Sequence, residues 1–340
     1  VTGPAGFLGS HIVYQLLQSG CAVRGIRVCR TYKAEYLKDD FKHPDFEVVI
    51  TDDLIACDYS DALVGVSSIV HVASPVPVPG VKENFIKLAV EGTLNILRQA
   101  QATQITKIVI IGTFGSALPN LLNDLLDPAR VISHEHWNRL SEKDVYECSP
   151  EMLPMIAYMT SKVLAERAAW NFVEKHPEMD LITLLPTTVY GPLAPTHVVK
   201  DPSTMLSTNA WIYALLSGPS GFYPPLPHPF SVDARDVAIA TVRALKAPPS
   251  NGEQRRILLN GGTISLRQAV QHLGKSRPEL RSRLLENGEP FYIEENTFDV
   301  AKVDLSMAER VLGMTSFIPL QKTIEDTADS LVEKERMWLK

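Results

Sequence analysis

Short apolar runs alternate with longer amphipathic stretches through the first half of the chain. Runs that are rich in Val and Ile and bounded by polar or turn residues predict strands, at 22–28, 47–51, 68–72, 107–111 and 180–185. Between them, a helical spacing of apolar residues predicts helices, at 7–18, 60–64, 84–102 and 156–175. This alternation predicts an α/β fold: a Rossmann-type doubly wound parallel sheet with helices on both faces.

The second half of the chain has a different pattern. Two proline-rich segments, 192–202 and 218–229, predict the kind of loop that holds a substrate over an open α/β sheet. The other elements predicted here are helices at 233–245, 265–272 and 322–337 and a strand at 254–260. We therefore expect a Rossmann-type domain and a smaller, mostly C-terminal α/β substrate lobe. The domain would take residues 1–190, with 230–248 returning to it, and the lobe would take 191–229 and 249–340.

Composition and charge exclude several classes of protein. The 33 Lys and Arg against 39 Asp and Glu give a net charge of −6, which disfavours a dominant nucleic-acid surface. No apolar run reaches the ~18–20 residues of a membrane span, and no signal-peptide pattern is visible. The four cysteines form no CxxC pair, which is typical of free thiols in a reducing compartment. We expect a cytoplasmic protein with no nucleic-acid or membrane partner.

A glycine-rich turn precedes the first predicted helix. Gly3, Gly6 and Gly9 have GxxGxxG spacing, and Phe7 and Leu8 begin the helix. The first glycine makes a tight turn, the second lets a pyrophosphate approach the backbone, and the third packs the helix on the sheet. The phosphates would lie at a helix N-terminus, where free N–H groups and the dipole favour anions. Because the chain opens directly on this turn, we expect the sequence to lack most of the first strand.

The end of the next strand distinguishes NAD from NADP. An acidic residue there accepts from the ribose 2′-hydroxyl, whereas an arginine pairs with a 2′-phosphate. Residues 23–33 contain four basic residues and no acid, which favours NADPH. The candidate contacts to the 2′-phosphate are Arg27, Arg30 and Lys33.

Two further strand ends offer contacts to a nucleotide. Asp53 could accept from the adenine amino group while Leu54 packs on the ring, although Asp53 could equally cap the next helix. The small residues Ala73, Ser74 and Pro75 would let the chain pass close to the nucleotide.

A tyrosine and a lysine share one face of a predicted helix. Tyr158 and Lys162 are four residues apart, so they point toward the same cleft. This pair suits carbonyl reduction, because a phenol can protonate the alkoxide that forms when hydride attacks the carbonyl carbon. A free tyrosine has a pKa of about 10, and a nearby ammonium together with an oxidised nicotinamide lowers it toward neutrality. The same lysine can hold the hydroxyls of the nicotinamide ribose.

Together these motifs resemble the extended short-chain dehydrogenase/reductase family, and within it the dihydroflavonol 4-reductase-like aldehyde and ketone reductases. The matching stretches keep the family order and are 3–9, 23–25, 71–75, 89–95, 158–162, 165–170, 185–188 and 232–238. The resemblance implies a reductase that transfers a hydride from NADPH to a carbonyl, with a Ser/Thr–Tyr–Lys active site.

The serine of that family follows the fifth strand, usually as a Ser-Ser pair. Aligning the strand at 107–111 puts Thr113 at the catalytic serine and Gly112 at its neighbour, while Ser116 is the other candidate. A threonine hydroxyl can still hydrogen-bond the substrate oxygen. The implied catalytic set is Thr113, Tyr158 and Lys162. The residues implied at the nicotinamide are Pro186 and Thr187, followed by Thr188.

The substrate is predicted to be apolar. Leu118 stands where flavonoid-handling relatives would have a polar, substrate-binding Asn, which argues against a dihydroflavonol. The aromatic residues expected around an apolar pocket are Trp211, Tyr213, Phe222 and Tyr223. We therefore expect a monomer or homodimer that reduces a hydrophobic aldehyde or ketone.

Two alternatives remain at this point. A sugar-nucleotide epimerase or dehydratase of the same superfamily would retain NAD, and the basic turn argues against it. A non-catalytic NADP-sensing protein would keep the nucleotide-binding fold, but it has no need of Tyr158 and Lys162. No metal site is predicted, because His134 and His136 lack the spacing of a zinc-binding helix.

Overall fold

The computed structural model describes residues 1–28, 42–51, 55–75, 85–195, 197, 199, 206–217, 229–284 and 299–338. Its helices are α1 (Phe7–Gln18), α3 (Ser60–Leu63), α4 (Phe85–Ala102), α5 (Leu122–Leu125), α6 (Glu142–Glu147), α7 (Leu153–Glu174), α9 (Asn209–Ser217), α10 (Ala234–Lys246), α11 (Leu266–Ser276), α12 (Arg281–Leu284), α13 (Ser306–Leu312) and α14 (Leu320–Trp338), with 3₁₀ turns η1 (Phe114–Ala117) and η2 (Pro278–Leu280). Its strands are β1 (Val23–Val28), β2 (Phe46–Thr51), β3 (Ser68–His71), β4 (Lys107–Ile111), β5 (Val131–Ile132), β6 (Asp180–Pro186), β7 (Thr188–Tyr190), β8 (Phe230–Asp233), β9 (Arg255–Leu259), β10 (Gly262–Thr263) and β11 (Lys302–Val303).

A parallel sheet lies at the centre of the molecule. One part pairs β1 with β2, and the other has the order β3-β4-β6-β9. Thr2 forms parallel bridges to Ile26 on β1 and His71 on β3, so it joins the two parts. The predicted doubly wound α/β fold is confirmed.

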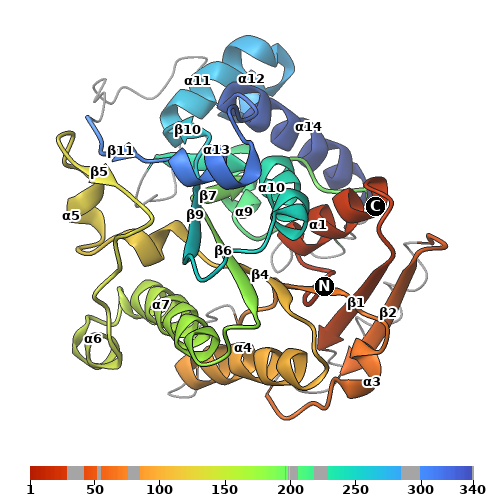
Figure 1. The fold of residues 1–340 in the computed structure, drawn as a ribbon. Coiled ribbons are helices and arrows are strands. Elements are labelled where there is room, and N and C mark those ends of the chain that lie inside the picture. Colours follow the sequence, from red (N-terminus) through yellow and green to blue (C-terminus); the bar gives the residue numbers. More distant parts are fainter. Residues whose placement is uncertain are drawn as a thin grey trace.

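Helices cover both faces of this sheet, as Figure 1 shows for α4 and α7 on one side and α1 and α10 on the other. The side chains of β4 explain the two layers, because alternate residues of a strand point to opposite faces. Val109 and Ile111 join the apolar cluster of α1, α10 and α13. Ile108 and Ile110 join the cluster of α3, α4 and α7. A strand buried on both faces has the continuous apolar sequence that β4 shows.

A second layer of elements covers the carboxyl ends of the strands. The small sheet β10-β8-β7 and the helices α9, α11, α12 and α14 enclose their own apolar cluster. Helix α10 follows β8 directly and packs back against α1. The proposed division into a Rossmann-type domain and a substrate lobe stays a prediction. Helix α9 lies between the two proline-rich segments 192–202 and 218–229, where no helix was predicted.

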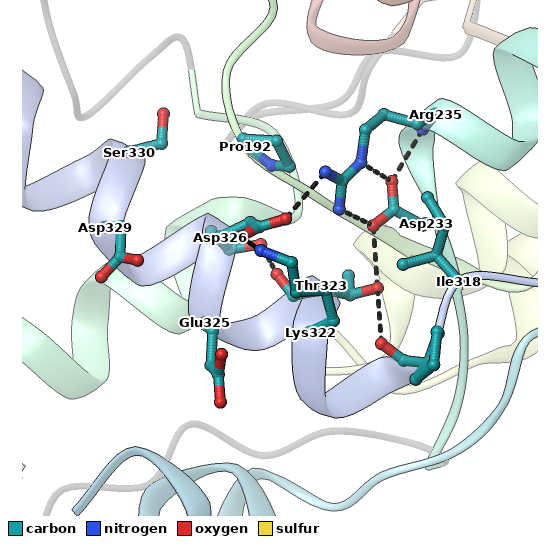
Figure 2. Close-up of polar contacts among 12 residues, drawn as sticks. Pro192, Asp233, Arg235, Ile318, Lys322, Thr323, Glu325, Asp326, Asp329 and Ser330 are labelled. Atoms are coloured by element: carbon teal, nitrogen blue, oxygen red, sulfur yellow. Dashed lines mark hydrogen bonds and ion pairs between the residues drawn. The ribbon is translucent and has the colours of Figure 1, made fainter. Parts of the chain in front are cut away.

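The C-terminal helix α14 is fastened to the start of α10 by charged side chains (Figure 2). Asp233 is fully buried and caps α10 by accepting from the Arg235 backbone N–H at 2.8 Å. The Arg235 guanidinium donates to both oxygens of Asp233 and, at 2.7 Å, to Asp326 on α14. Thr323, also on α14, donates to Asp233 at 2.8 Å. These contacts hold α14 against the start of α10.

One cavity of this structure does not lie where a ligand of such a sheet is expected. This cavity, of about 680 Å³, lies at the amino ends of β1 and β3 and is lined by both apolar and charged residues, among them Val23, Val70, Arg24 and Glu47. Ligands of open parallel sheets bind at the opposite, carboxyl ends of the strands.

No helix among the described residues has both the length and the apolar character needed to cross a membrane.

Candidate active site

Two of the three glycines in the glycine turn, Gly3 and Gly9, leave no room for a side chain. Gly3 has φ +67°, and a Cβ there would lie 3.1 Å from the backbone of Ala73. A Cβ on Gly9 would lie 2.0 Å from the Gly3 carbonyl oxygen. Helix α1 begins at Phe7, and its N-cap residue Gly6 provides no side-chain hydrogen bond. The first turn of α1 therefore keeps free N–H groups, which fits the predicted pyrophosphate.

The turn is braced by contacts that the sequence analysis missed. Thr2 Oγ1 accepts from the backbone N–H groups of Val72 and Ala73, both at 3.0 Å. Its hydroxyl proton is then free to point at His71 Nδ1, 3.0 Å away. Burial, with the Lys162 ammonium nearby, lowers the pKa of His71 to about 3, so the ring is neutral. These contacts fix the strand end that carries the expected nucleotide contacts, Ala73, Ser74 and Pro75, which are all half-buried.

The residues predicted to select NADPH are for the most part not described. Arg27 belongs to β1, whereas Arg30, Lys33, Asp53 and Leu54 lie outside the described residues. The remaining basic residue of this segment, Arg24, has another role. Its guanidinium donates to the carbonyls of Ala62 and Val64 at the end of α3, at 2.9 and 2.7 Å, and it pairs with Glu47.

Helix α7 carries the tyrosine and lysine side by side. Burial raises the pKa of Tyr158 and therefore opposes ionisation of its phenol. Lys162 Nζ donates to the Ile111 carbonyl at 3.4 Å, which places the ammonium at the carboxyl end of β4. Burial lowers the pKa of Lys162 to about 8, and the Glu166 carboxylate acts in the opposite direction. Lys162 is therefore mostly charged at neutral pH.

The loop after β4 brings Thr113 to the same place. Thr113 is half-buried and caps η1, with its Oγ1 accepting from the Gly115 N–H at 3.4 Å. A Cβ on Gly115 would lie 1.7 Å from Cε of Met159, the residue after Tyr158, so this loop packs directly against α7. Ser116 is fully buried, and its Oγ has no hydrogen-bond partner. Of the two candidates, Thr113 is the one open to a ligand.

The end of β6 completes the set of strand ends. Pro186 ends β6, and Thr188 begins β7. Between them, Thr187 is buried and is tied to β9, with its N–H donating to the Leu259 carbonyl at 3.0 Å and its hydroxyl reaching Asn260 at 3.3 Å. All the described candidate residues thus follow the carboxyl ends of neighbouring parallel strands or lie on the helices beside them.

The residues expected around the substrate have two different surroundings. Leu118 is buried in an apolar cluster with Phe114 and Phe230, just after the Thr113 loop. Tyr213 donates to Glu335 at 3.2 Å and packs edge-on against Trp338, so it fastens α9 to α14. Trp211 packs in the same lobe cluster. Phe222 and Tyr223 lie outside the described residues.

Comparisons with known proteins identify the family of this chain. The family model described as the 3-beta hydroxysteroid dehydrogenase/isomerase family matches residues 1–213. A putative uncharacterized oxidoreductase of Schizosaccharomyces pombe is 34% identical over 82% of this chain and 82% of its own length. A putative NADPH-dependent methylglyoxal reductase of Candida albicans is 28% identical over 98% of this chain and 97% of its own.

Solved structures show the same fold. The yeast methylglyoxal/isovaleraldehyde reductase Gre2, complexed with NADPH, matches with a TM-score of 0.81 at 21% identity, covering 98% of each chain. The resemblance drawn from the sequence motifs is confirmed. The chain belongs to the 3-beta hydroxysteroid dehydrogenase/isomerase family, among the extended short-chain dehydrogenases/reductases.

Proposed function

We propose that this chain is an NADPH-dependent carbonyl reductase that converts an aldehyde or ketone to the alcohol. The observation that carries the proposal is the meeting of the Tyr158–Lys162 face of α7 with the Thr113 loop at the carboxyl end of β4. A proton donor, a fixed cation and a hydroxyl then surround one place at the sheet edge where ligands bind. The names of the relatives from Candida albicans and yeast support the same chemistry.

The roles of the residues follow from their chemistry. NADPH, when bound, supplies the hydride. Tyr158 donates its proton to the oxygen that becomes negative as the hydride arrives. Burial raises the pKa of Tyr158. The positive charge of Lys162 would act against that effect, and its ammonium would hold the ribose hydroxyls of the nucleotide. Thr113 donates a hydrogen bond that orients the carbonyl oxygen.

The other parts of the site would hold the nucleotide and the substrate. The uncapped start of α1 would bind the pyrophosphate, and the basic residues after β1 would bind the 2′-phosphate. The apolar cluster of Leu118, Phe114 and Phe230 supports a hydrophobic substrate. We further propose that the protein works in the cytosol, as a monomer or homodimer.

The experiment that tests this proposal follows NADPH oxidation by absorbance with aliphatic, aromatic and keto-ester carbonyls. Wild type should turn over with NADPH faster than with NADH. Tyr158→Phe should lower kcat by about 10²–10⁴-fold, because it removes the general acid. Binding of NADPH, measured by fluorescence, should persist in the variant.

Other outcomes would favour the alternatives. Equal turnover in Tyr158→Phe would contradict the assigned proton donor. Tight NAD with no net consumption of NADPH would favour an epimerase or dehydratase, and binding of NADPH without turnover would favour a sensor.

A further inference from the structure

Arg256 on β9 is a fully buried arginine that lies behind the active-site loop. All five N–H groups of its guanidinium have acceptors in the structure. Nε and Nη2 reach the two carboxylate oxygens of Glu166 at 2.9 and 3.5 Å. The remaining acceptors are backbone carbonyls, those of His134 at 2.6 Å, His136 at 2.5 Å and Ser116 at 3.2 Å. The guanidinium carbon also lies 3.6 Å from the ring centre of Trp137.

These contacts fix the loop that follows Thr113. Ser116 lies three residues after Thr113, and its carbonyl accepts from Arg256 and, at 2.8 Å, from the Asn138 N–H. The Asn138 side chain donates to the Gly115 carbonyl at 2.9 Å. Segment 134–138 therefore lies against η1, and Arg256 holds both of them. The position of Thr113 depends on this arrangement.

The partner carboxylate lies on the catalytic helix. Glu166 is one turn beyond Lys162 on α7, its side chain is 2% exposed, and it accepts from Thr183 on β6 at 2.9 Å. A Cβ on Gly112 would lie 3.9 Å from Glu166 Oε2, so the carboxylate reaches the residue beside Thr113. The Glu166 carboxylate thus lies between α7, which carries Tyr158 and Lys162, and the end of β4, which leads to Thr113.

We propose that Glu166 and Arg256 form a positioning pair for the reaction, which holds the Thr113 loop against the catalytic helix and presents a carboxylate to Lys162. The inference rests on the proposed function and extends it to residues that do not touch the substrate. Stability alone does not account for such a pair, because buried ion pairs are often replaced by apolar residues without loss.

The pair has a consequence for the charge of Lys162. The groups that face this lysine from neighbouring elements are neutral His71 on β3, the Ile111 carbonyl on β4, and Glu166, behind which lies Arg256. From β6 comes the Thr183 hydroxyl, which is taken by Glu166. The charged side chains of α4 and α6 lie toward solvent, in surface pairs such as Arg98 with Glu91 and Lys143 with Glu147. Glu166 is thus the carboxylate that supports the ammonium.

The test is Glu166→Gln, which keeps the shape and removes the charge. Without the carboxylate, Lys162 should lose its proton at lower pH, so the alkaline limb of kcat/KM should move down by about one pH unit. The matched control is Glu174→Gln, the same change at an exposed position of the same helix. We expect the pH profile of the control to superimpose on that of wild type.

A second readout does not depend on turnover. NMR of protein labelled with ¹³C at lysine Cε would give the titration of Lys162, assigned by the signal missing in Lys162→Met. A midpoint lower by about one pH unit in Glu166→Gln supports the pair. An unchanged midpoint, or a kcat/KM reduced equally at every pH, would overturn it. If wild type reduces no carbonyl, the proposed function fails, and the lysine titration still decides on the pair.

Discussion

Arg256 and Arg235 each form a network with carboxylates, and the two networks differ in what the arginine binds. Arg256 is buried. Its guanidinium donates to one carboxylate, that of Glu166, and to backbone carbonyls of two segments, at Ser116 and at His134 and His136. Arg235 has a side chain that is 32% exposed, and it binds two carboxylates, one at the N-cap of α10 and one within α14. Figure 2 shows this second network, with Arg235 between Asp233 and Asp326.

The difference shows what each arginine stabilises. Helices α10 and α14 have their own backbone hydrogen bonds, so Arg235 joins two structures that are already regular. Arg256 instead donates to carbonyls outside helices and strands, those of His134 and His136, and shares the Ser116 carbonyl with the Asn138 N–H. Removing Arg256 should therefore disturb both stability and the active site, whereas removing Arg235 should lower stability alone.

The largest effect is expected for Arg256→Met. Methionine fills the apolar part of the space but leaves Glu166 charged and buried, with Thr183 as its remaining donor. Breaking a buried pair in this way costs about 3–5 kcal/mol. The free energy of unfolding in urea should fall by this amount, and kcat should fall with it in the folded fraction.

A second, milder substitution keeps the prediction testable if Arg256→Met does not fold. Arg256→Lys keeps the charge but cannot reach all the acceptors, so we expect a loss of roughly 2 kcal/mol. A loss below the error of the measurement in both variants would show that the loop does not depend on this side chain.

A smaller effect is expected for Arg235→Met. Asp233 keeps two donors after the change, the Arg235 backbone N–H and the Thr323 hydroxyl. Solvent also reaches the guanidinium, which weakens its ion pairs. We expect a loss of about 1–2 kcal/mol in urea unfolding, with the pH profile of kcat/KM unchanged. A shift of that profile would mean that the two networks are coupled.

The two networks also show how far sequence alone reaches. Helix α1 was predicted at 7–18, its observed bounds, because the glycine turn and the apolar spacing are local signals. The Tyr158–Lys162 pair was predicted to share one face of a helix for the same reason, since residues four apart on a helix are neighbours. The end of β4 at Ile111 was predicted from the continuous apolar run of this strand.

Arg256 had no such signal. The strand at 254–260 was predicted, but Glu166 lies 90 residues away in sequence from Arg256, and Ser116 lies 140 residues away. The one hint is an arginine placed directly before the apolar run Ile257, Leu258 and Leu259 of β9, because a buried charge needs partners. Thr2 was missed similarly, as a small polar residue whose partners come from β3.

The smallest effect concerns Asp236 on α10, at the edge of the second network. Its carboxylate is 5% exposed and accepts from the Ile318 N–H at 2.8 Å. Burial, with a smaller contribution from Asp233, raises its pKa to about 6, against the donation from Ile318 and the charge of Arg235. A folded pKa above the unfolded value of about 4 means that the folded state holds the proton more tightly. Asp236 therefore lowers stability as pH rises from about 4 through 6.

Asp236→Asn should remove this penalty. The shift corresponds to roughly 3 kcal/mol at most, and we expect a gain of about 1 kcal/mol above pH 7, because the amide also buries a donor group. Melting temperatures of wild type and variant should converge below about pH 4, where the carboxyl is neutral in both states. A difference that is the same at pH 4 and pH 8 would show that the carboxylate is already relieved by its neighbours. The second network would then balance its charges as completely as the buried pair of Arg256 and Glu166.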